Sequence, residues 1–421
     1  MSRPDTLEPA LTEAVQRSVR SVGTPFWLYE AQPIRERVRQ LRAFDCVRFA
    51  QKANSNVHVL RLLRALNVVA DAVSLGEVER ALRAGFVPGT DAHEIVFTAD
   101  VIDEATLTRV VELGIPVNCG SPDMLIQIGR VAPGHPVWLR LNPGFGHGHN
   151  RKTNTGGPLS KHGIWHEGLE DALRLVQAQR LSLVGLHMHI GSGVDYTHLH
   201  RVCESMLDAV RRLDRPIHAI SAGGGLSVPY RSGEPEIDVE KYYAAWHETR
   251  LEVERIVGNE IRLEMEPGRY LTGNAGVLVA EVRAVKKVAE NYFVLLDAGF
   301  NDLARPVLYG SHHDICFLTR DGASVDGPAY AIAVAGPLCE AGDVFTQHDG
   351  GFVTFRELPL PSVGDLAVVR DAGAYGATMS SNYNSRPLVP ELMLDDGKLT
   401  VIRRRQLIEQ LLDLEVQGEP L

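Results

Sequence analysis

Lys52 comes two residues after the apolar run 46–50, at the point where a buried strand would end. A lysine in this position either reaches solvent with its charged end or sheds its charge, because desolvation lowers its pKa. The neutral amine is a nucleophile that can form an imine with a carbonyl group. Lys52 alone fits both interpretations, so its role depends on the other residues that follow apolar runs.

Three further groups that follow apolar runs limit which cofactor the site could use. Gly223-Gly224-Gly225 is either a tight turn or a loop whose backbone N–H groups bind phosphate. Glu266 could pair with an arginine or hold a proton on a heterocyclic nitrogen, and Arg269, just beyond Gly268, could contact a phosphate or a carboxylate. An imine-forming lysine, a phosphate loop and a buried acid together predict pyridoxal 5'-phosphate as the cofactor.

Histidines offer a competing interpretation. His187 and His189 are two residues apart in an apolar run, so both side chains could point the same way along a strand and bind zinc, as in metal-dependent barrel hydrolases. Alternatively, one histidine lies over a cofactor ring and the other is a hydrogen-bonded core residue. Because the later strands add no further metal ligands, we expect no metal at this pair.

The polar segment 145–163 contains His147, His149 and His162 among several glycines. Three histidines could indicate a metal site, but long glycine-rich loops in compact domains are more typical of mobile covers. A solvated loop without a role is the remaining alternative.

The apolar runs also predict the fold. Eight of them alternate with segments whose leucines and alanines repeat at helical spacing, which is typical of parallel strands in βαβ units. They are residues 46–50, 68–73, 94–99, 115–119, 137–142, 183–190, 217–222 and 261–266. An open doubly wound sheet would need a glycine fingerprint after the first run, and QKANSN stands there instead. We therefore expect an α/β fold with a (β/α)₈ TIM-type barrel over residues 35–275.

Beyond Gly268 the pattern changes to short strand-like runs with turn signals and no long helices between them. This predicts a mostly antiparallel β domain, a sandwich or barrel, over 276–421. The run 25–30 precedes the barrel and is also strand-like, so we assign residues 1–34 to the β domain.

Three polar clusters lie in this second region. Arg305 and Tyr309 are four residues apart and suit a carboxylate, Cys339 stands beside Glu340, and Tyr375 lies among small residues where its hydroxyl could reach a phosphate. Each cluster alone is also compatible with an ordinary polar turn.

Composition limits the class of protein. The 421 residues are 44% hydrophobic and 23% charged with a net charge of −10, which excludes a disordered chain and gives no basic surface for nucleic acid. The five cysteines are scattered without a CxxC pair, which argues against disulfides and structural zinc. We expect neither a signal peptide nor a membrane span, and a reducing, cytoplasmic location.

Several motifs together resemble one family. They are FAQKANSN, DAVSLGE, GLHMHIGSG, GGGLS, EPGR, DAGFNDLARP, GPLCEAGD and DAGAYGATMSSNYNSRP. Their series, from about residue 25 to 410, is similar to that of the diaminopimelate decarboxylases, which belong to the alanine-racemase-like, fold-type III group of pyridoxal phosphate enzymes.

The resemblance implies a role for each matching residue. Lys52 resembles the lysine that holds the cofactor, His189 the histidine stacked on its ring, and Glu266 the acid on its ring nitrogen. The implied phosphate neighbours are Ser192, Gly223, Gly224, Gly225, Gly268, Arg269 and Tyr375. The implied substrate contacts are Arg305 and Tyr309 for a carboxylate, Glu340 for an amine, and Arg269 and Tyr375 beside them.

Cys339 resembles a catalytic acid delivered from a second subunit, so the resemblance implies a homodimer with shared sites. The expected reaction is decarboxylation of meso-2,6-diaminopimelate at its D-centre to L-lysine and CO₂, with Cys339 or Lys52 returning the proton. A decarboxylase of another amino acid is an alternative that predicts little dependence on Arg305. A non-catalytic relative would be expected to have lost Lys52 or Cys339, and both are present.

Overall fold

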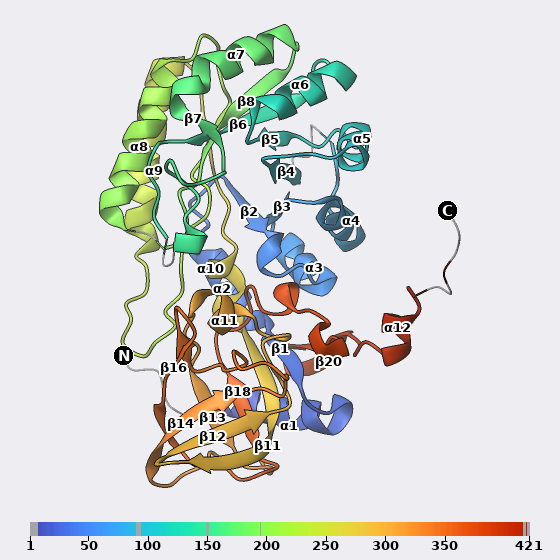
Figure 1. Ribbon diagram of the computed structural model, residues 1–421. Coiled ribbons are helices and arrows are strands. Elements are labelled where there is room, and N and C mark those ends of the chain that lie inside the picture. The colour runs from blue at the N-terminus through green and yellow to red at the C-terminus, as the bar shows by residue number, and fades with distance from the viewer. Residues whose placement is uncertain (1–6, 90–93, 149–150, 194, 416–417, 419–421) are drawn as a thin grey trace. The chain divides into compact units, whose positions relative to one another are not determined.

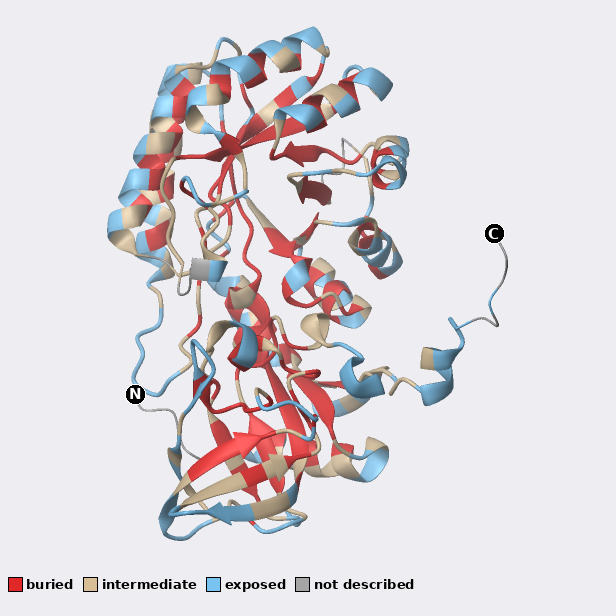
Figure 2. Ribbon diagram, viewed as in Figure 1, coloured by how far each residue is buried: buried red, intermediate tan, exposed pale blue. Residues whose placement is uncertain are grey.

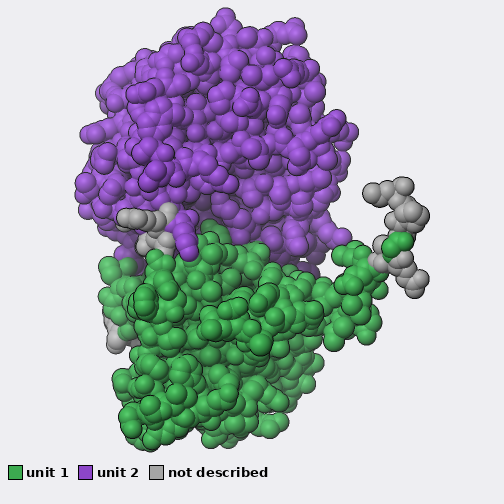
Figure 3. All heavy atoms as spheres, in the orientation of Figure 1, with its two compact units in different colours: residues 1–34, 229–235, 272–421 green, residues 35–228, 236–271 purple. Residues whose placement is uncertain are grey.

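The structure is a computed structural model that describes residues 7–89, 94–148, 151–193, 195–415 and 418. Contacts divide the chain into two compact units, coloured separately in Figure 3. We call residues 35–228 and 236–271 the barrel unit, and residues 1–34, 229–235 and 272–421 the β unit. Each is described separately below.

Eight parallel strands close into a ring in the barrel unit (Figure 1). In ring order they are β2 (Cys46–Ala50), β3 (Val69–Ala72), β4 (Ile95–Ala99), β5 (Val117–Cys119), β6 (Pro136–Asn142), β8 (Ser182–Met188), β9 (Ala219–Ser221) and β10 (Arg262–Met265). β10 pairs with β2 and β5 pairs with β6, which closes the barrel, while the short β7 (Ile164–Trp165) adds to β6. Each ring strand overlaps one predicted apolar run. The barrel is thereby confirmed, and the open sheet is excluded.

Amphipathic helices alternate with these strands and surround the ring. They are α3 (Val57–Ala65), α4 (Leu75–Ala84), α5 (Glu104–Glu112), α6 (Pro122–Val131), α7 (Leu169–Ala178), α8 (Tyr196–Arg211) and α9 (Val239–Val257). Figure 2 shows buried strands inside and helices whose outer faces are exposed. Side-chain caps start several helices: Ser74 accepts from the N–H of Glu77, and Asp195 accepts from that of Thr197. Residues just before a helix are therefore fixed at the same end of the barrel as the strand ends.

The β unit has a mixed, mostly antiparallel sheet. Its strands are β1 (Phe26–Glu30), β11 (Gly276–Val288), β12 (Asn291–Leu296), β13 (Ile315–Leu318), β14 (Ala329–Ala335), β17 (Arg356–Pro359), β18 (Leu366–Val369), β19 (Glu391–Asp395) and β20 (Lys398–Arg403), with β15 (Gln347–His348) and β16 (Phe352–Val353) forming a separate pair. β1 pairs antiparallel with β11 and parallel with β19, so a strand near the chain's start lies within the later sheet. Its residues Trp27 and Tyr29 are buried in the core of this unit.

Five further α-helices complete the description of the described residues. They are α1 (Pro9–Val22), α2 (Ala31–Gln40), α10 (Arg269–Thr272), α11 (Arg305–Tyr309) and α12 (Ile408–Leu412). No helix in the described part of the chain is long and apolar enough to cross a membrane. Residues 229–235, between β9 and α9, pack with the β unit.

Candidate active site

Glu266 follows β10 and is only 9% exposed. Its Oε2 lies 2.8 Å from Nε2 of His187 on β8, and its Oε1 accepts a hydrogen bond of 3.4 Å from Ser221 on β9. Burial alone would raise the pKa of Glu266, but His187 and then His189 and Arg140 outweigh it and hold that pKa well below its usual value. The barrel mouth therefore holds a buried carboxylate that stays ionised. Its partner is a histidine, not the arginine of the structural alternative.

His189 comes directly after β8 and is half-buried. Burial, and next the charges of Arg140 and Lys52, hold the pKa of His189 well below its usual value, so the ring is neutral near pH 7. Its Nδ1 is buried and has no hydrogen-bond partner among the described residues. A neutral ring with an unused nitrogen fits the predicted role beside a planar cofactor.

The zinc interpretation of this histidine pair gains no support. Nε2 of His187 is already bonded to Glu266. Within the described parts of the chain, neither His187 nor His189 belongs to a group of three side chains with metal-ligand spacing.

The glycine triplet after β9 is required by close contacts. A Cβ on Gly223 would lie 2.5 Å from the carbonyl oxygen of Met188, and Gly223 has a φ of +62°. A Cβ on Gly224 would lie 2.5 Å from the carbonyl oxygen of Glu266, and one on Gly225 would lie 2.6 Å from that of Gly191. Only glycine fits, and the loop presents bare backbone, as a phosphate site requires.

Lys52 lies in a single 3₁₀ turn, Gln51–Ala53, directly after β2. Its side chain is exposed, which corresponds to the first of the two interpretations, a lysine whose charged end reaches solvent. The turn packs on the end of β10, because a Cβ on Gly268 would lie 3.1 Å from that of Ala53. Lys52 still acts electrostatically on Asp71 and His189, which places its charge among the strand-end residues.

Asp71 on β3 is the most strongly perturbed acid near Lys52. It is 2% exposed and its Oδ1 has no hydrogen-bond partner among the described residues. Burial and then the charge of Glu266 raise the pKa of Asp71 to about 8, against a smaller opposing effect of Lys52. Two buried carboxyl groups at one barrel mouth thus hold opposite protonation states near neutral pH.

Ser192 and Arg269 are the remaining barrel residues that the sequence predicted for the site. Ser192 is half-buried, and its N–H donates to the carbonyl oxygen of Thr153 at 3.4 Å. Arg269 is half-buried at the first position of α10.

The long loop after β6 is anchored at several points. Asn142 donates to the carbonyl oxygens of Gly157 and His162 and accepts from the N–H of Gly157 at 2.8 Å. Asp100 accepts from Nδ1 of His162 at 2.5 Å and from the N–H of Gly163 at 2.8 Å. These bonds occupy His162, and His149 lies outside the described residues. The loop is therefore held in place along the part that the structure describes.

In the β unit, Arg305 and Tyr309 begin and end the short helix α11. Arg305 is 4% exposed, and its guanidinium lies 4.6 Å from the ring centre of Tyr230. Its Nη1 donates to Nε2 of His313 at 2.9 Å. Because Arg305 has only donors, Nε2 of His313 must be the acceptor, and Nδ1 carries the hydrogen that it donates to the carbonyl oxygen of Arg370 at 2.8 Å.

Cys339 and Glu340 are both exposed on the loop after β14. Asp343 is buried beneath them and accepts hydrogen bonds from the N–H groups of Phe300 and Leu338, at 2.7 and 2.8 Å. The N–H of Cys339 donates to Oδ1 of Asn384 at 3.0 Å. The backbone of this loop is thus well fixed, while its two predicted functional side chains point to the exterior of the unit.

Tyr375 is half-buried with a φ of +57°, in the left-handed region that non-glycine residues rarely adopt. Gly376 beside it is tightly enclosed, since a Cβ there would lie 2.6 Å from the ring of Trp27. Such strained backbone concentrates at functional sites, which fits a specific role for this tyrosine.

The predicted residues thus fall into two sets. Lys52, His189, Glu266 and the glycine loop meet within the barrel unit, whereas Arg305, Tyr309, Cys339, Glu340 and Tyr375 belong to the β unit. Sequence reasoning gave no role to Asp71 and Arg140, although both lie at predicted strand ends. It missed His313, whose only signal is its position eight residues after Arg305.

The barrel set fits pyridoxal phosphate on structural grounds. The glycine loop offers backbone that side chains would block, His189 offers a neutral ring, and Glu266 offers an ionised carboxylate. The strand-end arrangement matches the usual location of barrel active sites.

Comparisons with known proteins agree with these features. The sequence profile of the family described as "Pyridoxal-dependent decarboxylase, pyridoxal binding domain" matches residues 32–273. Diaminopimelate decarboxylase of Streptomyces coelicolor is 60% identical over 398 residues, which cover 94% of this chain and 90% of the relative.

Solved structures are also similar. A crystal structure of a diaminopimelate decarboxylase is 57% identical, with a TM-score of 0.94 and 97% of each chain covered. The diaminopimelate decarboxylase of Helicobacter pylori, in complex with L-lysine, is 29% identical with a TM-score of 0.85, covering 95% of this chain and 98% of the other.

Proposed function

The chain belongs to the diaminopimelate decarboxylase family of pyridoxal-dependent decarboxylases, and we propose that residues of its two units divide the work of this reaction between them. The enzyme decarboxylates meso-2,6-diaminopimelate at its D-centre and releases L-lysine and CO₂, the last step of lysine biosynthesis. The observation that carries the proposal is the buried Glu266–His187 pair beside a glycine loop, at the mouth of a closed barrel.

The barrel unit would hold the cofactor. Lys52 would supply the amine that binds it, His189 would contact its ring, and Glu266 would keep a proton on the ring nitrogen. The phosphate would be bound by Ser192, Gly223, Gly224, Gly225, Gly268, Arg269 and, from the β unit, Tyr375. When bound, pyridoxal phosphate supplies an electron sink that lets the substrate carboxylate leave as CO₂.

The ionised state of Glu266 supports its role. The ionised carboxylate, unlike the neutral acid, stabilises a proton on a neighbouring nitrogen, and His187 keeps Glu266 charged despite its burial. His189 suits a position beside the cofactor ring, because its neutral imidazole places no positive charge against that ring.

The β unit would recognise the far end of the substrate. A buried carboxylate and ammonium both need partners of opposite charge. Arg305 and Tyr309 would bind the carboxylate at the distal centre, and Glu340 would bind the ammonium group. Arg269 and Tyr375 would complete the substrate contacts. A substrate without the distal carboxylate would form no ion pair with Arg305, which favours diaminopimelate over ornithine or arginine.

Either Cys339 Sγ or Lys52 Nζ would return a proton to the α-carbon. Cys339 and Glu340 are exposed on a fixed loop, which suits residues that act on a second copy of the chain. We therefore propose a homodimer in which these two residues complete the partner's site.

Two further proposals concern organisation and location. We infer that the two units are the two domains of the chain, with the strand β1 belonging to the β domain. The five cysteines form no disulfide, which supports a reducing, cytoplasmic location.

One experiment tests the function directly. The purified protein should show a near-visible absorbance band that borohydride abolishes, and it should release CO₂ and form L-lysine from meso-diaminopimelate. A colourless protein, or equal activity towards ornithine, would contradict the proposal.

A further inference from the structure

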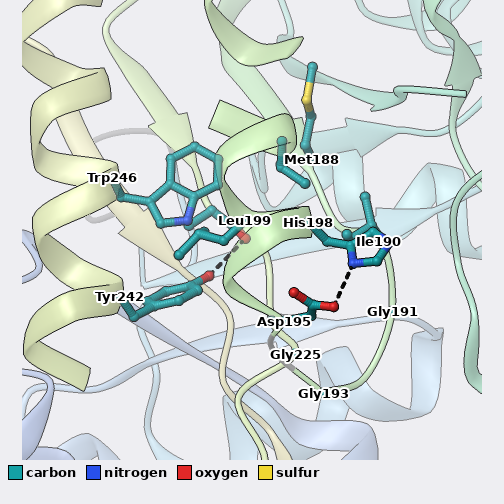
Figure 4. Close-up of a pocket in the computed structure, with 13 residues that line it drawn as sticks. Met188, Ile190, Gly191, Gly193, Asp195, His198, Leu199, Gly225, Tyr242 and Trp246 are labelled. Carbon is teal, nitrogen blue, oxygen red and sulfur yellow. Dashed lines mark hydrogen bonds and ion pairs between the residues drawn. The ribbon is translucent and has the colours of Figure 1, made fainter. Parts of the chain in front are cut away.

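His147, Asp195 and His198 form a cluster outside the residues discussed so far. One ligand atom from each side chain lies within 4.8 Å of the other two, and all three residues are half-buried. Figure 4 shows Asp195 and His198 facing each other at the edge of a small cavity. Two imidazoles and a carboxylate are a set that transition-metal ions bind in proteins.

Two separate segments bring these residues together. His147 belongs to the long loop after β6, and its N–H donates to the carbonyl oxygen of Ile190 at 3.0 Å. Thr155, in the same loop, donates to that oxygen and, through Oγ1, to the carbonyl oxygen of His189 at 3.0 Å. The loop is thus fastened to the segment that follows β8 and leads into α8.

The start of α8 orients the other two ligands. Oδ1 of Asp195 accepts from the N–H of Thr197 at 2.8 Å, which caps the helix and leaves Oδ2 facing His198. His198 is on the first turn of the helix, three residues later, so its ring lies on the same face as the cap. The ring of His147 lies over that of His198, with centres 4.7 Å apart.

The distances and contacts suit a shared ion better than a simple ion pair. Nδ1 of His198 lies 3.0 Å from Oδ2 of Asp195, near the ligand separation of about 3.3 Å in a tetrahedral zinc site. Apart from this ion-pair contact, the nitrogen has no hydrogen-bond partner among the described residues. An ion pair between Asp195 and His198 alone would not account for the position of His147 beside them.

A small cavity lies beside Asp195 and His198. It measures about 40 Å³, and its lining includes Asp195 and His198 together with Gly191, Gly225 and Trp246. This volume has room for a water molecule. Three protein ligands with a water in the fourth position are a common zinc geometry.

We propose that His147, Asp195 and His198 bind one divalent transition-metal ion of the Zn²⁺ class. The ion fastens the loop that contains His147 to the segment between β8 and α8. Because that segment begins at His189, the metal stiffens the side of the barrel mouth that carries the histidine. The site is distinct from the His187 and His189 pair, and the cavity beside it is also lined by Gly225 of the proposed phosphate loop.

The test is a zinc titration of the full-length protein with its cofactor bound, after removal of metals by a chelator, in competition with a chromophoric zinc indicator. One Zn²⁺ per chain should bind. The affinity should fall roughly 100-fold or more in His198→Ala and in His147→Ala, since even outer partners of a metal contribute about 10–100-fold. Cobalt should give visible absorption bands that these variants lack. Zinc should also slow hydrogen exchange of residues 151–160.

His200→Ala is the matched control, because His200 is an exposed histidine two residues further along α8 and should leave zinc affinity unchanged. The absorbance of the bound cofactor and the elution volume report that each variant is folded. Equal zinc affinity in wild type and in the double variant His147→Ala, His198→Ala would overturn the proposal, because the metal would then be bound elsewhere, for instance by cysteine.

Discussion

The barrel unit and the β unit position their functional residues in opposite ways. At the barrel mouth, Glu266 and His187 are buried at strand ends and bonded to each other at 2.8 Å. In the β unit, Cys339 and Glu340 are exposed, and only the backbone beneath them is fixed, largely by Asp343. Buried groups have their charge set by their own chain, whereas exposed groups are free to act on another molecule. The barrel set is therefore organised within one chain, whereas the exposure of Cys339 and Glu340 is compatible with the proposed action on a second copy.

Replacing Lys52 tests the barrel side of this comparison and has the largest expected effect. Lys52→Ala should lower kcat by about 10⁴-fold, the upper end of what one positioned proton-transfer group contributes, and should abolish the borohydride-sensitive absorbance. Lys287→Ala, at an exposed lysine of β11, is the control and should retain full activity. Residual activity of Lys52→Ala within about tenfold of wild type would remove Lys52 from the mechanism.

Replacing Arg305 tests the β side. Arg305→Gln should raise KM for meso-diaminopimelate by about 10–100-fold, because a hydrogen bond to a charged group contributes about 1.5–3 kcal/mol. Cofactor absorbance should not change. Arg283→Gln, an exposed arginine on β11, serves as the control in steady-state assays. If the cofactor is lost while KM stays constant, Arg305 belongs to cofactor binding instead.

His313 should have a smaller effect that acts through Arg305. Its Nε2 accepts from Arg305, so His313→Leu should raise KM roughly fivefold, because the variant loses a positioning contact of about 1 kcal/mol and keeps the charge of Arg305. His313→Gln keeps an acceptor and should restore most of the loss. Burial, and next the charge of Arg305, lower the pKa of His313 well below its usual value, so this contribution to KM should stay constant from pH 6 to 8. A failure of glutamine to rescue would indicate a packing role only.

Asp71 should affect stability and its pH dependence more than activity. Burial and then Glu266 raise the pKa of Asp71 from 3.8 to about 8, so the folded state retains a proton that the unfolded state releases. Wild type should lose stability as the pH rises through this range, and Asp71→Asn should lack that loss. The variant's advantage in urea denaturation should grow by about 1 kcal/mol or more between pH 5 and 8. Asp349→Asn, at an exposed acid, should show no such trend, and a parallel trend in both variants would refute the assignment.

The sequence predicted the barrel more fully than the β unit, for a physical reason. Parallel strands buried on both faces need continuous apolar runs, and each of the eight runs marks one strand of the ring. The residues after those runs then had to meet at one mouth. In the β unit the sequence predicted short strands only in general, because strands of four or five residues, such as β13 and β19, are too short for a clear pattern.

The residues of the candidate active site were likewise predictable only in part. The positions of Glu266 and the glycine loop follow from strand ends alone. The roles of Cys339 and Glu340 came only from the resemblance, because an exposed polar pair has no distinctive pattern by itself. The exposure of Lys52, the partner of Glu266 and the contact between His313 and Arg305 depend on tertiary packing, which spacing along the chain does not encode.

Mixing two inactive variants tests most directly whether the β unit acts on a second copy. Lys52→Ala and Cys339→Ala would be unfolded and refolded together in equal amounts, and CO₂ release from meso-diaminopimelate would be measured. If Cys339 completes the partner's site, half of the dimers carry one intact site, and activity should recover to about a quarter of wild type. Activity no higher than the sum of the two separate variants, with mixed dimers verified by mass, would show that each chain completes its own site.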